Sequence, residues 1–128
     1  MEKLKRLLLI EDNKNIALTE RFCLETEGYQ ILLAGDGVTG LEIAINEKPD
    51  LILLDLLIPK MDGFLVLEAL RSNPSVSDIP VLVTSAKAQV EDLEKAYTFK
   101  IDGYLIKPFT PNELINKVSQ ILSKLEKE

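Results

Sequence analysis

The sequence has no histidine and only one cysteine among its 128 residues. Without imidazole, any acid-base or metal chemistry has to come from carboxylates and lysines. The single cysteine, Cys23, cannot form an internal disulfide. It lies between Phe22 and Leu24 in a segment of helical period, which predicts a buried structural thiol rather than a reactive one.

Long hydrophobic runs and an excess of basic residues are also missing. No apolar stretch approaches the roughly eighteen residues of a membrane helix, and no segment has the layout of a secretion signal. We therefore expect a cytoplasmic protein that does not bind membranes. The net charge is -6 and the fifteen basic residues are scattered, so the electrostatic footprint of a protein that binds a nucleic-acid backbone is absent. This argues against direct nucleic-acid binding.

What is present suits one globular domain over residues 1–128. The composition is 46% hydrophobic and 28% charged, and a chain of this length can bury a core without disulfides. Short apolar runs alternate with longer segments of helical period, and several of these runs lack polar alternation. Such runs are typical of parallel strands that are covered on both faces. They occupy residues 7–10, 31–34, 51–54, 81–83 and 104–106.

The segments between the runs carry helix signals. After the first run, apolar or small residues recur at three-four spacing, and Gly28 provides a stop. The last helix is predicted to have Thr110 as its N-cap, Pro111 at its first helical position and Glu113 completing a capping box. The expected apolar positions are Ile16, Phe22, Cys23 and Thr26 in the first helix, and Leu114, Val118, Ile121, Leu122 and Leu125 in the last.

Acidic residues follow two of the predicted strands. Glu11 and Asp12 follow the first strand, and Asp55 follows the third. Ligands of doubly wound sheets bind outside the carboxyl ends of the strands, so these carboxylates are candidates for one site. Crowded carboxylates repel one another unless a hard cation such as Mg²⁺ relieves the repulsion. Acidic residues are also common at the start of a helix, where they interact favourably with the positive end of the helix dipole. A strand can also simply end in a surface aspartate.

The fourth and fifth strands end in a hydroxyl and an ammonium group. Thr84 and Ser85 adjoin at the end of the fourth strand, and strand alternation allows only one of them to face a given site. Lys107 ends the fifth strand before Pro108, which can support a cis bond. An ammonium group there would balance the acidic cluster and bind a phosphoryl oxygen. The plainer interpretation is a turn hydroxyl and a surface lysine.

Taken together and in order, these segments resemble the receiver domain of bacterial two-component response regulators. The matching segments are residues 8–12, 49–55, 59–63, 79–86 and 104–109. The resemblance implies that Glu11 and Asp12 help to bind Mg²⁺. It also implies that Asp55 accepts a phosphoryl group from a sensor histidine kinase or a histidine phosphotransferase, and that the hydroxyl and Lys107 respond to it.

The resemblance implies roles for further positions. The backbone carbonyl of Leu57 is expected to complete the metal site, and Tyr104 matches the aromatic switch residue of the family. Pro80 sets a register that selects Ser85 over Thr84. The sequence departs from the family pattern at Lys60, where glycine is frequent, and at residues 100–101, where Lys-Ile replaces the usual Gly-Ala.

We therefore expect a flavodoxin-like, doubly wound α/β domain with five parallel strands in the order 2-1-3-4-5 and five helices. It would be a phosphorylation-controlled signalling switch that acts on a downstream protein or an attached output domain. It would catalyse only its own phosphorylation and dephosphorylation.

Three other classes of protein fit the sequence less well. A flavodoxin needs a phosphate loop rich in glycine and hydroxyls where this chain has the acidic segment 11–15. A haloacid-dehalogenase-type phosphohydrolase needs a second aspartate two residues after its nucleophile, where this chain has Leu57 after Asp55. Receiver-like modules that are never phosphorylated usually lack a site residue, and this chain keeps them all.

Overall fold

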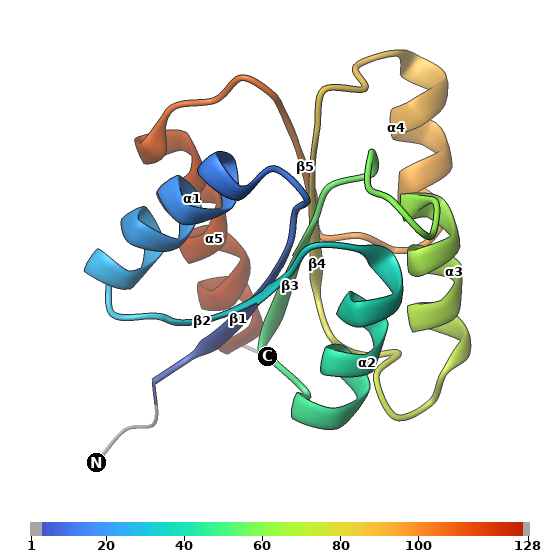
Figure 1. The fold of residues 1–128 in the computed structure, drawn as a ribbon, viewed down its shortest axis with the longest axis horizontal. Coiled ribbons are helices and arrows are strands. Elements are labelled where there is room, and N and C mark those ends of the chain that lie inside the picture. The colour runs from blue at the N-terminus through green and yellow to red at the C-terminus, as the bar shows by residue number, and fades with distance from the viewer. Residues whose placement is uncertain (1–3, 127–128) are drawn as a thin grey trace.

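Five strands and five helices alternate along the chain in the computed structural model, which describes residues 4–126 (Figure 1). The strands are β1 (Arg6–Ile10), β2 (Gln30–Ala34), β3 (Leu51–Leu54), β4 (Val81–Ser85) and β5 (Gly103–Ile106). The helices are α1 (Lys14–Thr26), α2 (Gly37–Glu47), α3 (Gly63–Ser72), α4 (Val90–Tyr97) and α5 (Pro111–Glu126).

All strands are parallel and lie in the order β2-β1-β3-β4-β5, which confirms the predicted topology. Helices α1 and α5 cover one face of the sheet, and α2, α3 and α4 cover the other (Figure 1). Within residues 4–126, no helix combines the length and apolar character needed to cross a membrane.

The two covered faces explain why the strands are apolar without alternation. In β1, Leu8 and Ile10 belong to the core under α2, α3 and α4, whereas Leu7 and Leu9 belong to the core under α1 and α5. All four side chains are at most 1% exposed. Because neighbouring residues of a strand point to opposite faces, each face needs its own apolar residue at every second position.

The predicted start of the last helix is confirmed by its hydrogen bonds. The amide of Glu113 donates to the hydroxyl of Thr110 at 3.1 Å, and the amide of Thr110 donates to the Glu113 carboxylate at 3.0 Å. This is a reciprocal capping box. In α5, Leu114, Val118, Ile121 and Leu122 are buried as predicted. Leu125 is 40% exposed, because it lines a surface hollow beside Tyr97 and not the sheet core.

The face that α1 turns to the sheet was predicted wrongly. Phe22 is 70% exposed and Ile16 is 36% exposed, while Cys23 is only half-buried and Thr26 is exposed. The residues that α1 buries are Ala17, Glu20 and Leu24. These residues also follow three-four spacing, but the charged glutamate among them makes this stripe less apolar than the stripe that contains Phe22.

Candidate functional site

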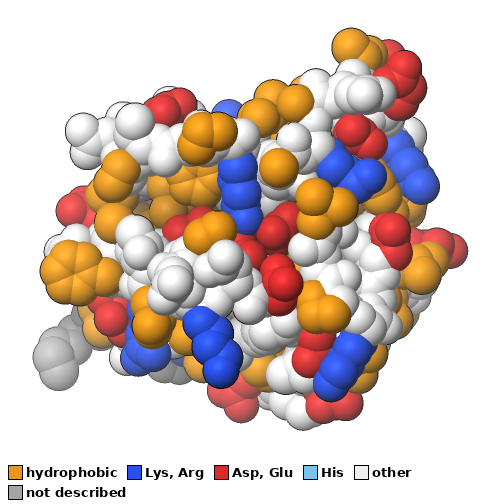
Figure 2. All heavy atoms as spheres, turned by 45° about the horizontal axis from the view of Figure 1, so that its top comes forward, with side chains coloured by type: hydrophobic (Ala, Val, Ile, Leu, Met, Phe, Trp, Pro, Cys, Tyr) orange, Lys and Arg blue, Asp and Glu red, His pale blue; other side chains and the backbone are white. Residues whose placement is uncertain are grey.

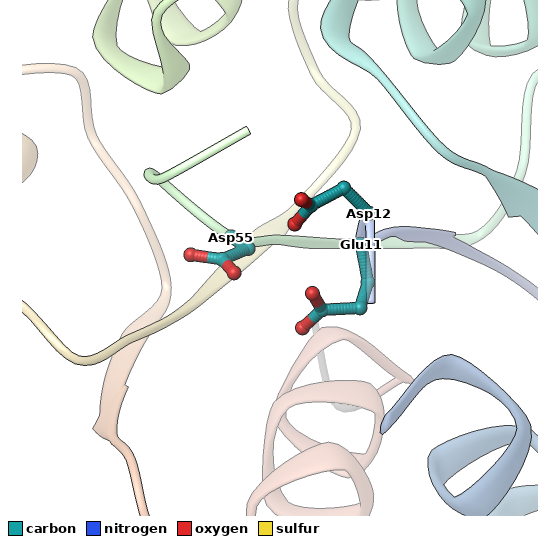
Figure 3. A group of neighbouring side chains, drawn as sticks. All are labelled: Glu11, Asp12 and Asp55. Carbon is teal, nitrogen blue, oxygen red and sulfur yellow. The ribbon is translucent and has the colours of Figure 1, made fainter. Parts of the chain in front are cut away.

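Three carboxylates meet at the carboxyl edge of the sheet. Glu11 and Asp12 follow β1, and Asp55 follows the neighbouring strand β3, whose end is joined to β1 by a 3.0 Å hydrogen bond from the Asp55 amide to the Ile10 carbonyl. One oxygen from each carboxylate lies within 4.8 Å of the others, and Figure 3 shows the three side chains converging. The structure thus brings together the acidic residues that the sequence singled out.

Lys107 reaches this cluster from β5, across the intervening strand β4. Its ammonium group donates a hydrogen bond to Asp55 at 3.0 Å and another to Glu11. Strand alternation aligns the three side chains on one face, because Glu11, Asp55 and Lys107 continue the rows that begin with Leu9, Leu53 and Leu105. The Lys107–Pro108 peptide bond is cis.

Burial and neighbouring charged groups shift the pKa values of Glu11 and Lys107. Burial raises the pKa of Glu11, although the hydrogen bond from Lys107 opposes this. Burial by itself lowers the pKa of Lys107, but the hydrogen bonds and charges of Glu11 and Asp55 outweigh it, and the pKa is raised. Three carboxylates and one ammonium group leave the cluster with an excess of negative charge. An anion that approaches the cluster is repelled until a cation offsets this charge.

The donor set fits a hard divalent cation, which prefers oxygen ligands. Both oxygens of Glu11 already accept hydrogen bonds, one from Lys107 and one from the Asn13 amide at 3.1 Å. Asp12 is exposed and accepts no hydrogen bond from the described residues. Asp12 is therefore the most accessible carboxylate ligand of the three. Both oxygens of Asp55, like those of Glu11, already accept hydrogen bonds, in this case from the Leu57 amide and from Lys107. The carbonyl of Leu57 stays a prediction, although its amide donates to Asp55 at 2.9 Å.

Ser85 and Tyr104 lie on the other face of the sheet. Ser85 is fully buried at the end of β4, in the row of Val81 and Val83, and Tyr104 packs partly buried against the same core. Lys87 links the two, since its amide donates to the Ser85 hydroxyl at 3.1 Å and its carbonyl accepts from the Tyr104 hydroxyl at 2.7 Å.

The roles of Ser85 and Tyr104 remain predictions. Among the described residues, no hydrogen bond joins Ser85 to the carboxylates. Burial raises the pKa of Tyr104, so its hydroxyl stays protonated and can donate. Thr84, which is also buried, continues the row of Leu82 on the face of Asp55.

The two lysines that depart from the family pattern occupy special backbone positions. Lys60 has φ 68° and Lys100 has φ 57°, both in the left-handed region. Glycine adopts this conformation without a steric penalty, whereas a residue with a Cβ is disfavoured there. The loops at Lys60 and Lys100 therefore adopt the left-handed backbone conformation that glycine favours, although lysine carries a Cβ.

Glu20 was missed by the sequence reasoning. This glutamate of α1 is 5% exposed, and burial raises its pKa to about 7. No described residue donates a hydrogen bond to it. Its position between Ala17 and Leu24, on a helical stripe that includes both, was the signal that could have revealed it.

Fold and site together define a doubly wound α/β domain with an acidic cluster at the switch point of its sheet, where β1 and β3 adjoin, and this cluster could hold a metal ion. The family model for the response regulator receiver domain matches residues 7–119. The chain belongs to this family, whose members are phosphoryl-accepting switches of two-component signalling.

Curated relatives agree with this assignment. The chain is 38% identical to the DNA-binding dual master transcriptional regulator RpaA of Synechocystis sp. and 36% identical to the alkaline phosphatase synthesis transcriptional regulatory protein PhoP of Bacillus subtilis. Each alignment covers 95% of this chain. It covers 51% of RpaA and 50% of PhoP, so the chain spans about half the length of these relatives.

A solved structure supports the fold over almost the whole chain. The CheY-like response regulator receiver domain protein from Methanospirillum hungatei superposes with a TM-score of 0.91 at 29% identity. The superposition covers 98% of both chains.

Proposed function

We propose that Asp55 is the phosphoacceptor and that residues 1–128 form one receiver domain that is switched by its phosphorylation. The observation that carries this proposal is the ion pair at 3.0 Å between Lys107 and Asp55, set among two further carboxylates. A carboxylate held this way is close to both a metal site and an ammonium group. Phosphoryl transfer needs these two sources of positive charge around its acceptor.

In the proposed reaction, an oxygen of Asp55 forms a bond to phosphorus while the bond from phosphorus to a histidine nitrogen of the donor breaks. The donor imidazole keeps the released electron pair and takes up a proton from solvent. Bound Mg²⁺ would neutralise charge on the phosphoryl oxygens. The amide of Leu57 and the ammonium group of Lys107 hold the two oxygens of Asp55 in place before transfer.

Once Asp55 is phosphorylated, Lys107 and the hydroxyl of Ser85 bind phosphoryl oxygens through charge-assisted hydrogen bonds. A movement of Ser85 breaks the hydrogen bond that its hydroxyl accepts from the Lys87 amide. Lys87, whose carbonyl accepts the hydrogen bond of the Tyr104 hydroxyl, is then free to move. The proposed readout is a change in protein contacts on the surface from Lys87 to Lys124. A partner responds to the extent that it binds the two states differently.

The partners in this proposal are a sensor histidine kinase or histidine phosphotransferase and a downstream protein or an attached output domain. The protein would be a cytoplasmic signalling domain, with no activity besides its own phosphorylation and hydrolysis of the aspartyl phosphate. Relatives that are about twice as long and are named transcriptional regulators support an output domain as one possibility.

Incubation with acetyl phosphate and Mg²⁺, followed by intact-mass spectrometry, tests the proposal. We expect the mass of one added phosphoryl group, which is absent in Asp55→Asn and in chelator. Asp78→Asn is the matched control, because Asp78 is exposed and makes no hydrogen bond through its side chain within the described residues. Modification of Asp55→Asn to the same extent as the parent would refute the assignment.

A further inference from the structure

A pocket of about 340 Å³ adjoins the carboxylate cluster, between α1 and the connection from β5 to α5. Its wall includes Glu20 of α1 and the segment from Lys107 to Phe109. Figure 2 looks onto this edge of the sheet and shows acidic side chains at its centre with a basic side chain beside them. Since its ammonium group bonds to Glu11 and Asp55, Lys107 belongs to the pocket wall and to the carboxylate cluster at once.

The carboxylate of Glu20 has no partner in this pocket. Glu20 is the one acidic residue of the wall and is 5% exposed, and no described residue donates a hydrogen bond to its side chain. Every fully buried side-chain polar atom of residues 4–126 has a partner, so the Glu20 oxygens are the ones that keep access to the pocket. A carboxylate in such a place is costly unless a cation approaches it.

Lys107 is the one basic residue of the wall. Burial raises the pKa of Glu20 to about 7, and the charge of Lys107 opposes this rise. A lysine side chain is a flexible stem that can carry its ammonium group to a new partner while the backbone stays in place. The rest of the wall is largely apolar and suits such a stem. Its apolar members are Ile16, Pro108 and Phe109.

The present partners of Lys107 belong to the cluster that could hold a divalent cation. Its ammonium group lies 3.0 Å from one oxygen of Asp55, and the other oxygen accepts from the Leu57 amide. Two positive charges beside one carboxylate repel each other. Occupation of the cluster by a cation therefore weakens the attraction that Glu11 and Asp55 exert on the ammonium group. The carboxylate of Glu20 is then the stronger partner.

We propose that Lys107 has two positions: the one observed at Glu11 and Asp55, and a second in the pocket, with Glu20 as its counter-ion, when a divalent cation occupies the cluster. Glu20 is a positioning residue, because it acts through Lys107 and touches neither the cation nor a phosphoryl group. Lys107 stays beside Asp55 in both positions and returns from Glu20 to the more highly charged phosphoryl oxygens on transfer. Only this return rests on the proposed function.

The first test is a titration with Mg²⁺ at about pH 8, where Glu20 is ionised in the folded protein, followed by the amide signals of Asp12 and Asp55. We expect Glu20→Gln to weaken Mg²⁺ binding at least about fivefold, because the displaced ammonium group loses its counter-ion. Glu20→Asp keeps a carboxylate and should restore part of this loss. Glu27→Gln, which removes an exposed charge at the end of α1, should bind Mg²⁺ like the parent. Equal affinity in Glu20→Gln and the parent would overturn the proposal.

A double-mutant cycle decides whether Glu20 acts through Lys107 or through its negative charge alone. Lys107→Met removes the ammonium group and keeps a flexible side chain. In this background, Glu20→Gln should change the affinity for Mg²⁺ by less than about twofold. An effect as large as in the parent would mean that Glu20 attracts the metal by its charge, and the positioning role would be wrong.

The side chain of Lys107 reports its own position in a protein with isotope-labelled lysine and glutamate. We expect a nuclear Overhauser effect between the ε-methylene protons of Lys107 and the γ-methylene protons of Glu20, which grows as Mg²⁺ is added. This measurement needs no substitution and does not depend on the folding of a variant. If the Lys107 signals stay unchanged while Mg²⁺ saturates the amide shifts, Lys107 remains with the cluster and the second position does not exist.

Acetyl phosphate labelling separates a failure of this inference from a failure of the proposed function. Labelling of Asp55 in a protein whose affinity for Mg²⁺ ignores Glu20→Gln removes the second position and leaves the receiver function intact. A contact between Lys107 and Glu20 that depends on Mg²⁺, in a protein that is not labelled, keeps the two positions and refutes the phosphoacceptor role of Asp55.

Discussion

Replacing Glu20 by glutamine should make the free energy of unfolding less dependent on pH. The folded protein holds the pKa of Glu20 at about 7, against an ordinary value of 4.5, because the carboxylate is buried. Below the ordinary value, the group is protonated in both states and carries no penalty. As the pH rises from 4.5 to about 7, the unfolded chain loses this proton first, so folding becomes less favourable.

The size of the effect follows from the two pKa values. A raised pKa costs about 1.4 kcal/mol for each pH unit, so the displacement from 4.5 to about 7 amounts to about 3 kcal/mol above neutral pH. Glutamine has the shape of the protonated side chain but does not titrate. We therefore expect the free energy of unfolding of Glu20→Gln to exceed that of the parent by up to about 3 kcal/mol at mildly alkaline pH. This difference should disappear as the pH falls below the ordinary pKa of the glutamate.

Urea denaturation followed by circular dichroism, at a series of pH values in metal-free buffer, measures this difference. Glu11 also titrates, but it is common to both proteins and largely cancels. Glu27→Gln, the exposed control, should stay within about 0.5 kcal/mol of the parent at every pH. If the stability curves of Glu20→Gln and the parent run parallel across the series, the reasoning about burial is wrong.

Four further outcomes are expected. Asp12→Ala should lose most of the affinity for Mg²⁺ in a metal titration and should stabilise the metal-free fold by relieving carboxylate repulsion; undiminished Mg²⁺ binding would contradict this. Lys100→Gly should raise the free energy of unfolding by up to about 1 kcal/mol, since φ is 57° at that residue; a loss of stability in urea denaturation would count against the strain. The aspartyl phosphate should last minutes to hours because the apolar Leu57 offers hydrolytic water no hydrogen bond, and timed mass spectra that show decay within seconds would exclude this. Beryllofluoride, a mimic of the phosphoryl group, should shift the amide signals of Tyr104 and α5; changes confined to the loops around Asp55 would argue against the proposed route.

The sequence by itself determined the elements and the edge at which the chemistry is placed. All five strands were predicted, because runs such as residues 51–54 are apolar at every position and only a sheet covered on both faces buries them all. The start of α5 was also determined locally, since Thr110 and Glu113 cap the helix through side chains three residues apart. Residues that follow parallel strands share an edge of the sheet, which is why Glu11 and Asp55 were expected to meet.

Tertiary structure decided which side chains pair and which helical stripe is buried. Lys107 bonds to both Glu11 and Asp55 only because the register of β1, β3 and β5 puts all three on one face, a fact that spacing in the sequence does not contain. In α1 the stripe with Phe22 and the stripe with Glu20 have the same period, and the sheet buries the one with the glutamate. Periodicity shows which residues share a face, but the sum of contacts with neighbouring elements selects the face that packs, and that sum can override the cost of burying one charge.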